Sequence, residues 1–266
     1  MPQVELLYQR DEYFLTVALF AFLLLAAEAG FRRGRALQAR NDDATEKPQL
    51  AVLQSSVLGI LALLLGFTLA MALSRFEMRS QLGVAEANAI GTTHLRSQML
   101  GEPSRSSVEH SLRQYVDARL DLYDSTLDQL STNAAASRQE RLQSDLWSAA
   151  VRAAQPDPHS IPAGLFISSL NEAIDLQAKR DAATRNHVPE SVLLLLVLVA
   201  IGALGLIGYG CGLVNDRHFG QVVITSIVIA LVILAIIDLD RPRRGLIQVS
   251  QGSMIALRDS LPASPH

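Results

Sequence analysis

Histidine, cysteine and grouped acidic residues are the side chains that most often support catalysis or metal binding, and in this sequence they are dispersed. The six histidines lie in separate segments, and no two of them have the four-residue spacing of a helical zinc site. Cys211 is the single cysteine and lies in an apolar stretch, where a thiol usually packs as a small hydrophobe. The sequence has no nucleophile motif and no phosphate-binding glycine loop. We therefore expect neither an enzyme nor a bound cofactor.

One acidic row stands out in the middle of the chain. Its members recur at intervals of four, three and four residues, which places them on one side of a helix: Asp117, Asp121, Asp124 and Asp128. Such a row repels itself unless cations or basic side chains lie nearby. We interpret it as a solvated helix face. The alternative is a vestibule that concentrates cations, or a loosely held divalent ion.

A second set of charges lies at the edges of apolar segments. Ionisable groups near hydrocarbon usually face protein or water, because their exposure to lipid is costly. The set comprises Arg75, Glu77, Arg79, Glu86, Asp238, Asp240 and Arg241. We expect these residues to form a charge network at the membrane edge, by pairing between the residues around position 77 and those around position 240. Interfacial anchoring and a role at a pore mouth remain alternatives for this network.

The elements that position these residues are membrane helices. The 266-residue chain is 49% hydrophobic and 18% charged, with a mean hydropathy of +0.23, which is too apolar for an ordinary soluble protein. Four apolar stretches, at about 13–31, 50–74, 191–213 and 219–239, each approach the roughly 20 residues that span a bilayer. A net charge of −3 provides no basic field for nucleic acid. The sequence predicts an all-α, polytopic membrane protein.

The four spans divide the chain into parts. We expect an N-terminal membrane hairpin (1–74), an extramembrane helical bundle (75–189), a C-terminal membrane hairpin (190–240) and a tail (241–266). The second span should continue unbroken from about Leu50 to Leu100, because no proline follows Ser74 in this stretch.

Three further helices are expected in the bundle. An apolar stripe predicts a helix from Ser107 to Leu130. The next is expected from Ser137 to Gln155, with Ser137 as its N-cap. The last should start near Ser160, with Pro162 in its first turn.

Small residues mark two helix faces. In the second span Ser55, Gly59 and Gly66 share one side, and in the third span several glycines between Gly202 and Gly212 do the same. Such faces permit close backbone approach between helices, and in the second span they are also compatible with the lining of a narrow path. Both interpretations imply association of helices, within or between chains.

Three blocks of sequence resemble a known family. The first runs from Ser74 to Arg79 and on to the stretch Glu86–Arg96. The second contains Leu112 and Tyr115, and the third runs from Asp238 to Ser250. Together they resemble the bestrophin-like family of bacterial membrane proteins of unknown function. The resemblance implies relatives that are oligomeric anion channels with a pore on the symmetry axis. It also draws attention to Asn88, Thr92 and Arg96, which would form a polar constriction or a hydrogen-bonded clamp.

These observations predict a homo-oligomeric ion channel of the bacterial inner membrane, with the second span beside a central path. The candidate path residues are Ser55, Gly59, Gly66, Asn88, Thr92 and Arg96. The expected partners are the lipid bilayer, further copies of the chain and inorganic ions, and ion selectivity is left open. Basic residues near the spans favour a cytoplasmic helical bundle, although the cluster at Arg32 points the other way. The alternative is a membrane-anchored signalling or scaffold protein that conducts no ions.

Overall fold

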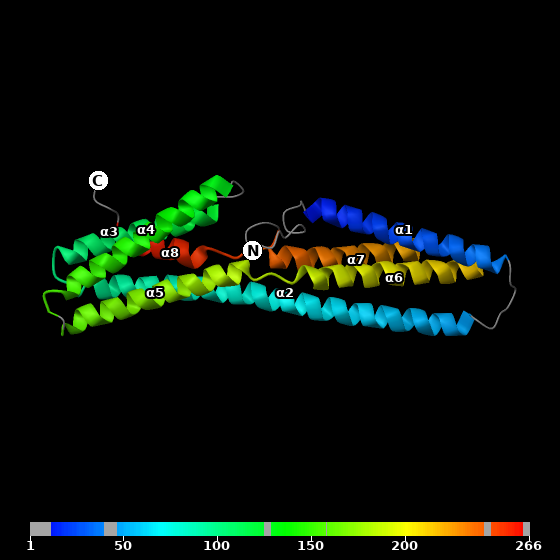
Figure 1. Cartoon of the computed structure of the whole chain (residues 1–266), viewed down its shortest axis with the longest axis horizontal. Coiled ribbons are helices and arrows are strands. Elements are labelled where there is room, and N and C mark those ends of the chain that lie inside the picture. Colours follow the sequence, from blue (N-terminus) through cyan, green and yellow to red (C-terminus); the bar gives the residue numbers. More distant parts are fainter. Residues whose placement is uncertain (1–11, 40–46, 125–128, 158, 242–245, 263–266) are drawn as a thin grey trace. The chain divides into compact units, whose positions relative to one another are not determined.

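The computed structural model describes residues 12–39, 47–124, 129–157, 159–241 and 246–262 (Figure 1). Within these ranges the regular structure is helical and no β-strand occurs. The helices are α1 (Glu12–Gln38), α2 (Lys47–Ser97), α3 (Ser104–Asp124), α4 (Gln129–Ala154), α5 (Ile161–Arg185), α6 (Glu190–Val214), α7 (Phe219–Asp240) and α8 (Gly252–Ser260). Four helical stretches are long and apolar enough to cross a membrane. The predicted all-α membrane fold is confirmed.

The chain forms two compact units. The first comprises Met1–Phe76 and His187–Ile247, and the second comprises Glu77–Asn186 and Gln248–His266. Helix α2 continues for 51 residues without a break, as the absence of proline after Ser74 predicted. It therefore contributes residues to both units.

Close packing of α1 against α6 organises the first unit. A Cβ atom at Gly208 would collide with the carbonyl of Ala27, and one at Gly212 would collide with the carbonyl of Phe31. Contacts this close require glycine, and they let the two backbones approach as small residues do in membrane helix pairs. The glycine face of the third span is therefore a packing surface. Gly202 is the exception, because among the described residues no atom would lie within 4 Å of its Cβ.

One residue, Asn215, ends α6 and starts the turn that leads to α7. Asn215 adopts the left-handed conformation (φ 57°), and its backbone N–H donates to the carbonyls of Cys211 and Gly212 at the end of α6. Asparagine tolerates this conformation better than most residues and commonly ends helices in this way. Since α7 starts at Phe219, the short connection makes the two helices antiparallel neighbours.

The second unit is a bundle around its own apolar core. The largest buried side chains come from α2, α3, α4 and α5: Ile90, Val108, Leu112, Leu146 and Phe166. Helix α5 begins as predicted, with the Ser160 hydroxyl accepting a hydrogen bond from the Ala163 N–H at 3.4 Å. The tail also contributes, because α8 places Met254 in this core with 2% of its surface exposed.

The predicted boundary between the second and third bundle helices was wrong. Helix α4 already begins at Gln129, so Leu130 belongs to α4 and Ser137 lies inside this helix instead of at its N-cap. Residues 125–128, which follow Asp124 of α3, lie outside the described residues. Two properties of the sequence explain the difference. The run Ala134–Ala136 has the highest helix propensity available, and Ser137 is exposed, where an interior serine is tolerated.

Candidate functional site

Within the first unit, one face of α2 remains exposed along its apolar stretch. Along the middle of this face runs a line of exposed positions, spaced by three or four residues and mostly small, which we call the membrane seam: Val52, Ser55, Gly59, Leu63, Gly66, Ala70 and Ser74. Larger exposed side chains flank it, among them Leu53, Ile60 and Phe67. Among the described residues nothing would lie within 4 Å of a Cβ at Gly59 or Gly66. The opposite face carries the buried residues Leu61, Thr68 and Ala72. The apolar stretch of α2 has hydrophobic residues on all sides, but its buried residues lie on one side only.

Within the second unit, α2 continues to expose one face, which we call the polar seam. It consists of Glu77, Gln81, Val84, Asn88, Thr92 and Leu95. Glu77 is its one charged member. The buried positions of this half, which include Glu86, Ile90 and Thr93, again lie on the other side of the helix.

The six predicted path residues are distributed unevenly over these two faces. Ser55, Gly59 and Gly66 lie on the membrane seam, and Asn88 and Thr92 lie on the polar seam. Arg96 lies beside the polar seam, where its Nη1 donates a hydrogen bond of 2.9 Å to the Leu165 carbonyl of α5. This contact ties α2 to α5.

Glu86 occupies the centre of a buried ion cluster in the second unit. Its carboxylate is fully buried and lies 2.7 Å from Arg119 Nε and 2.8 Å from Arg180 Nη1. Arg119 also lies 3.5 Å from Asp181. Burial disfavours the charged guanidinium, but the Glu86 carboxylate overcomes this effect and raises the pKa of Arg119. The four side chains balance two negative charges with two positive charges.

Glutamine side chains complete the cluster. The amide oxygen of Gln139 in α4 accepts from Arg119 Nη1 at 3.0 Å, and that of Gln251 accepts from Arg180 Nη2 at 2.7 Å. The cluster therefore joins α2, α3, α4, α5 and the segment before α8. Sequence reasoning identified Glu86 but missed its two arginine partners and the three further members of the cluster, because no local spacing connects residues so far apart in the chain.

Tyr115 lies close to this cluster. Burial is the main influence on its hydroxyl and raises the pKa of Tyr115. Among the described residues its hydroxyl has no hydrogen-bond partner.

The acidic residues at the end of α7 hold backbone groups. The carboxylate of Asp238 accepts hydrogen bonds from the N–H groups of Leu246 and Ile247, at 2.8 and 3.0 Å. Asp240 is fully buried, and its Oδ2 accepts from the Val188 N–H at 2.7 Å. His187 Nδ1 lies 3.0 Å from the Asp240 carbonyl. Both carboxylates therefore fix the segments that enter α6 and leave α7.

The three arginines of the predicted edge network lie in different environments. Arg79 donates to the carbonyls of Ala183 and Asn186, at 3.1 and 2.9 Å, and so satisfies carbonyl groups at the end of α5. Arg75 lies 3.8 Å from the sulfur of Met71, and Arg241 is buried with 6% of its surface exposed. Pairing between the residues around position 77 and those around position 240 stays a prediction.

The acidic row of α3 is accompanied by arginines. Asp117 lies 3.9 Å from Arg113 Nε, and Asp121 lies 3.1 Å from Arg138 Nη1. The side chain of Asp124 and all of Asp128 lie outside the described residues. In the part of the chain that the structure describes, no group of three histidine, cysteine, aspartate or glutamate residues is arranged to hold a metal ion.

Comparison with a family model and with solved structures shows which proteins this chain resembles. The model of the bestrophin-like domain matches residues 18–254. Comparison with curated proteins gives no match. Among solved structures, a point mutant of a bacterial bestrophin homologue from Klebsiella pneumoniae is 17% identical, with a TM-score of 0.65, and the match covers 92% of this chain and 97% of that one.

Two further structures agree. The structure of the Klebsiella pneumoniae homologue solved with zinc phasing gives a TM-score of 0.62 at 16% identity, over 94% of this chain and 97% of that one. A structure described only as a mutant membrane protein gives 0.65 at 17% identity, over 92% and 97% of the two chains. These matches show a shared fold. Because the family model covers most of the sequence, this multi-pass membrane protein belongs to the bestrophin-like family.

Proposed function

We propose that copies of this chain assemble in the bacterial inner membrane into an ion channel, with the membrane seam and the polar seam of α2 lining a central path. Membership of the bestrophin-like family supports an ion channel in general. The observation that carries the proposal is the line of mostly small residues along the middle of the exposed face of α2, which has the period of the helix and lies opposite the buried residues Leu61, Thr68 and Ala72.

The low burial of α2 within one chain supports an arrangement between copies. Only 17% of an apolar 18-residue stretch of α2 is buried within the chain, whereas 44% of the corresponding stretch of α7 is buried. Glycine and alanine on an exposed membrane face offer little apolar surface to lipid, but they leave room for a path and permit close approach of neighbouring helices. The hydroxyl groups of Ser55 and Ser74 would give water and ions polar contacts along an otherwise apolar face.

The charge of the polar seam favours cations. Glu77 is exposed and is the one formal charge on either seam. In a symmetric assembly each copy would contribute one Glu77 carboxylate to a ring, and rings of acidic side chains occur in cation channels. We therefore propose that the path conducts cations, although the family resemblance alone pointed to anions. We place the second unit in the cytoplasm, from the basic residues that border it.

Flux through purified protein in liposomes tests this function. We expect the protein to dissipate a potassium gradient and its reversal potential to follow the cation equilibrium. Glu77→Gln should move the reversal potential toward zero, because the ring loses its charge. Glu140→Gln is the matched control, since Glu140 is an exposed acidic residue of α4, and it should change nothing. An intact oligomer without flux would contradict the channel and favour a membrane anchor or scaffold.

A further inference from the structure

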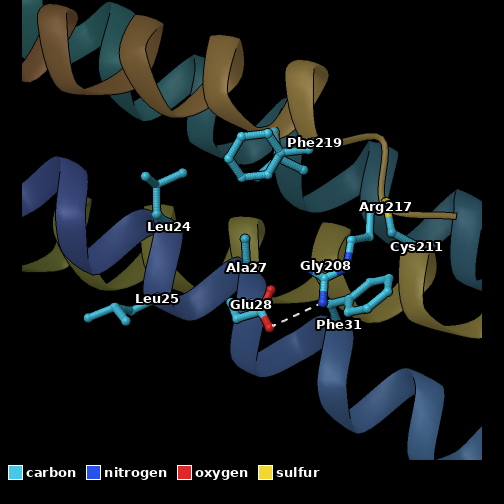
Figure 2. Close-up of a pocket in the computed structure, with 10 residues that line it drawn as sticks. Leu24, Leu25, Ala27, Glu28, Phe31, Gly208, Cys211, Arg217 and Phe219 are labelled. Carbon is cyan, nitrogen blue, oxygen red and sulfur yellow. Dashed lines mark ion pairs between the residues drawn. The ribbon is translucent and has the colours of Figure 1, made fainter. Parts of the chain in front are cut away.

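A pocket opens in the first unit between α1, α6 and the start of α7 (Figure 2). Its volume is about 250 Å³. Most of its wall is apolar and includes Leu24, Leu25, Phe219 and Val222. Leu25 and Phe219 expose 63% and 67% of their surfaces. Since α1 and α7 are membrane helices, these two side chains make a wall that is open to the hydrocarbon of the bilayer.

Charged groups lie at one end of this pocket. Figure 2 shows Glu28 and Arg217 facing each other, with Arg217 Nη2 3.7 Å from Glu28 Oε1. The same carboxylate oxygen accepts a hydrogen bond from Arg32 Nε at 2.8 Å. The Arg217 guanidinium also lies 4.8 Å from the centre of the Phe31 ring, within range of a cation–π contact. The side chains around the pocket thus hold Arg217 at its mouth.

The mouth carries more positive than negative charge. The Glu28 carboxylate serves two guanidinium groups, and 59% and 77% of the Arg217 and Arg32 side chains remain exposed. The exposed Asp216 is the second carboxylate near this end and lies 3.4 Å from His218. The last turns of α1 add the exposed residues Arg33 and Arg35. Guanidinium groups with unused N–H donors suit phosphate oxygens. An anionic group is therefore the complement of this end of the pocket.

We propose that the pocket binds an anionic phospholipid. An acyl chain would lie against Leu25 and Phe219, and the phosphate would lie between Arg217 and Arg32. Basic pockets between membrane helices recognise anionic lipid headgroups in this way. Water is a poor occupant of the apolar part, because few polar groups line it. A zwitterionic lipid carries a cationic group beside its phosphate, and the arginines at the mouth of the pocket would repel that group. An anionic lipid avoids this repulsion. This proposal does not depend on ion conduction.

The single cysteine supplies a direct reporter, because Cys211 lines the pocket and is partly exposed. The protein would be placed in nanodiscs of phosphatidylcholine, alone or with phosphatidylglycerol, and treated with an uncharged maleimide. We expect alkylation of Cys211 to be about fivefold slower with phosphatidylglycerol, the scale of roughly one basic contact to an anionic lipid. Arg217→Gln should abolish this protection, and Arg217→Lys should keep part of it.

Arg152→Gln is the matched control, since it removes an exposed arginine of α4 in the second unit, which takes no part in the pocket. All variants are compared in the same lipid, so the surface potential of the bilayer is held constant. Equal alkylation rates in the two lipids, or full protection in Arg217→Gln, would overturn the proposal. Protection by inorganic phosphate in phosphatidylcholine nanodiscs would assign the site to a free anion and also overturn it. Phosphatidylglycerol retained through purification, counted by mass spectrometry, gives a second readout and should fall in Arg217→Gln.

Discussion

Replacement of Glu86 by glutamine tests the buried ion cluster. The change keeps the size of the side chain and removes one negative charge from a site with no exposed surface. Two arginines, Arg119 and Arg180, lie within 2.8 Å of the lost charge. The cluster is neutral in the native protein and would carry a net charge of +1 in the variant.

The expected loss of stability follows from this imbalance. Removing one partner of a buried ion pair typically costs about 3–5 kcal/mol, because the remaining charge is left uncompensated. The glutamine oxygen can still accept one hydrogen bond, and Asp181 remains near Arg119. We therefore expect Glu86→Gln to lower the free energy of unfolding by about 3 kcal/mol, at the lower end of this range.

Thermal unfolding in detergent provides the assay. Trp147 is the single tryptophan and lies in α4 of the second unit, so its fluorescence follows the unit that contains the cluster. The expected fall in the midpoint is about 6–12 °C. Glu109→Gln is the control, because it breaks a partly exposed pair with Arg105, four residues earlier on the same helix, at 3.1 Å, and should cost less than about 1 kcal/mol. Equal shifts in the two variants would refute the assigned role of Glu86.

Three further substitutions test the packing and the buried polar groups by thermal unfolding. Gly208→Val should destabilise the first unit by about 1–3 kcal/mol through a clash with α1, whereas Gly202→Val should be tolerated; equal stability of the two variants would contradict the α1–α6 contact. Tyr115→Phe should be neutral or stabilising, because the buried hydroxyl has no partner among the described residues; a loss above about 1 kcal/mol would reveal a hidden partner. Asp240→Asn should lower stability far more than Asp145→Asn, since Asp240 is buried and Asp145 is exposed, and similar midpoints would argue against a structural role for Asp240.

Much of the fold could be predicted because its signals are local. The length of an apolar run predicts a membrane span, and the absence of proline after Ser74 predicts the continuous α2. Glycines repeated on one face of α6 predict close helix packing without naming the partner helix. The boundary between α3 and α4 was missed because local signals compete there, with the alanine run at 134–136 extending a helix that Ser137 was expected to start.

The partners of charged residues were less predictable. Glu86 pairs with Arg119 and Arg180, which lie 33 and 94 residues away in the sequence, and only tertiary packing brings them together. Asp238 and Asp240 were expected to pair with arginines, which stays a prediction, and the backbone N–H groups that each of them accepts could not be named from the sequence. Single-sequence patterns indicate that such charges must be satisfied and do not indicate by which group.

The central claim, that ions pass along the exposed face of α2, is tested most directly by modifying that face during conduction. Ser74→Cys on a Cys211→Ala background places one thiol on the membrane seam, and Val228→Cys places one on the exposed side of α7. We predict that a cationic methanethiosulfonate reagent sharply and irreversibly reduces the cation current of the Ser74→Cys protein and leaves the Val228→Cys protein unchanged. An unaltered current after complete modification of Ser74→Cys would contradict the account.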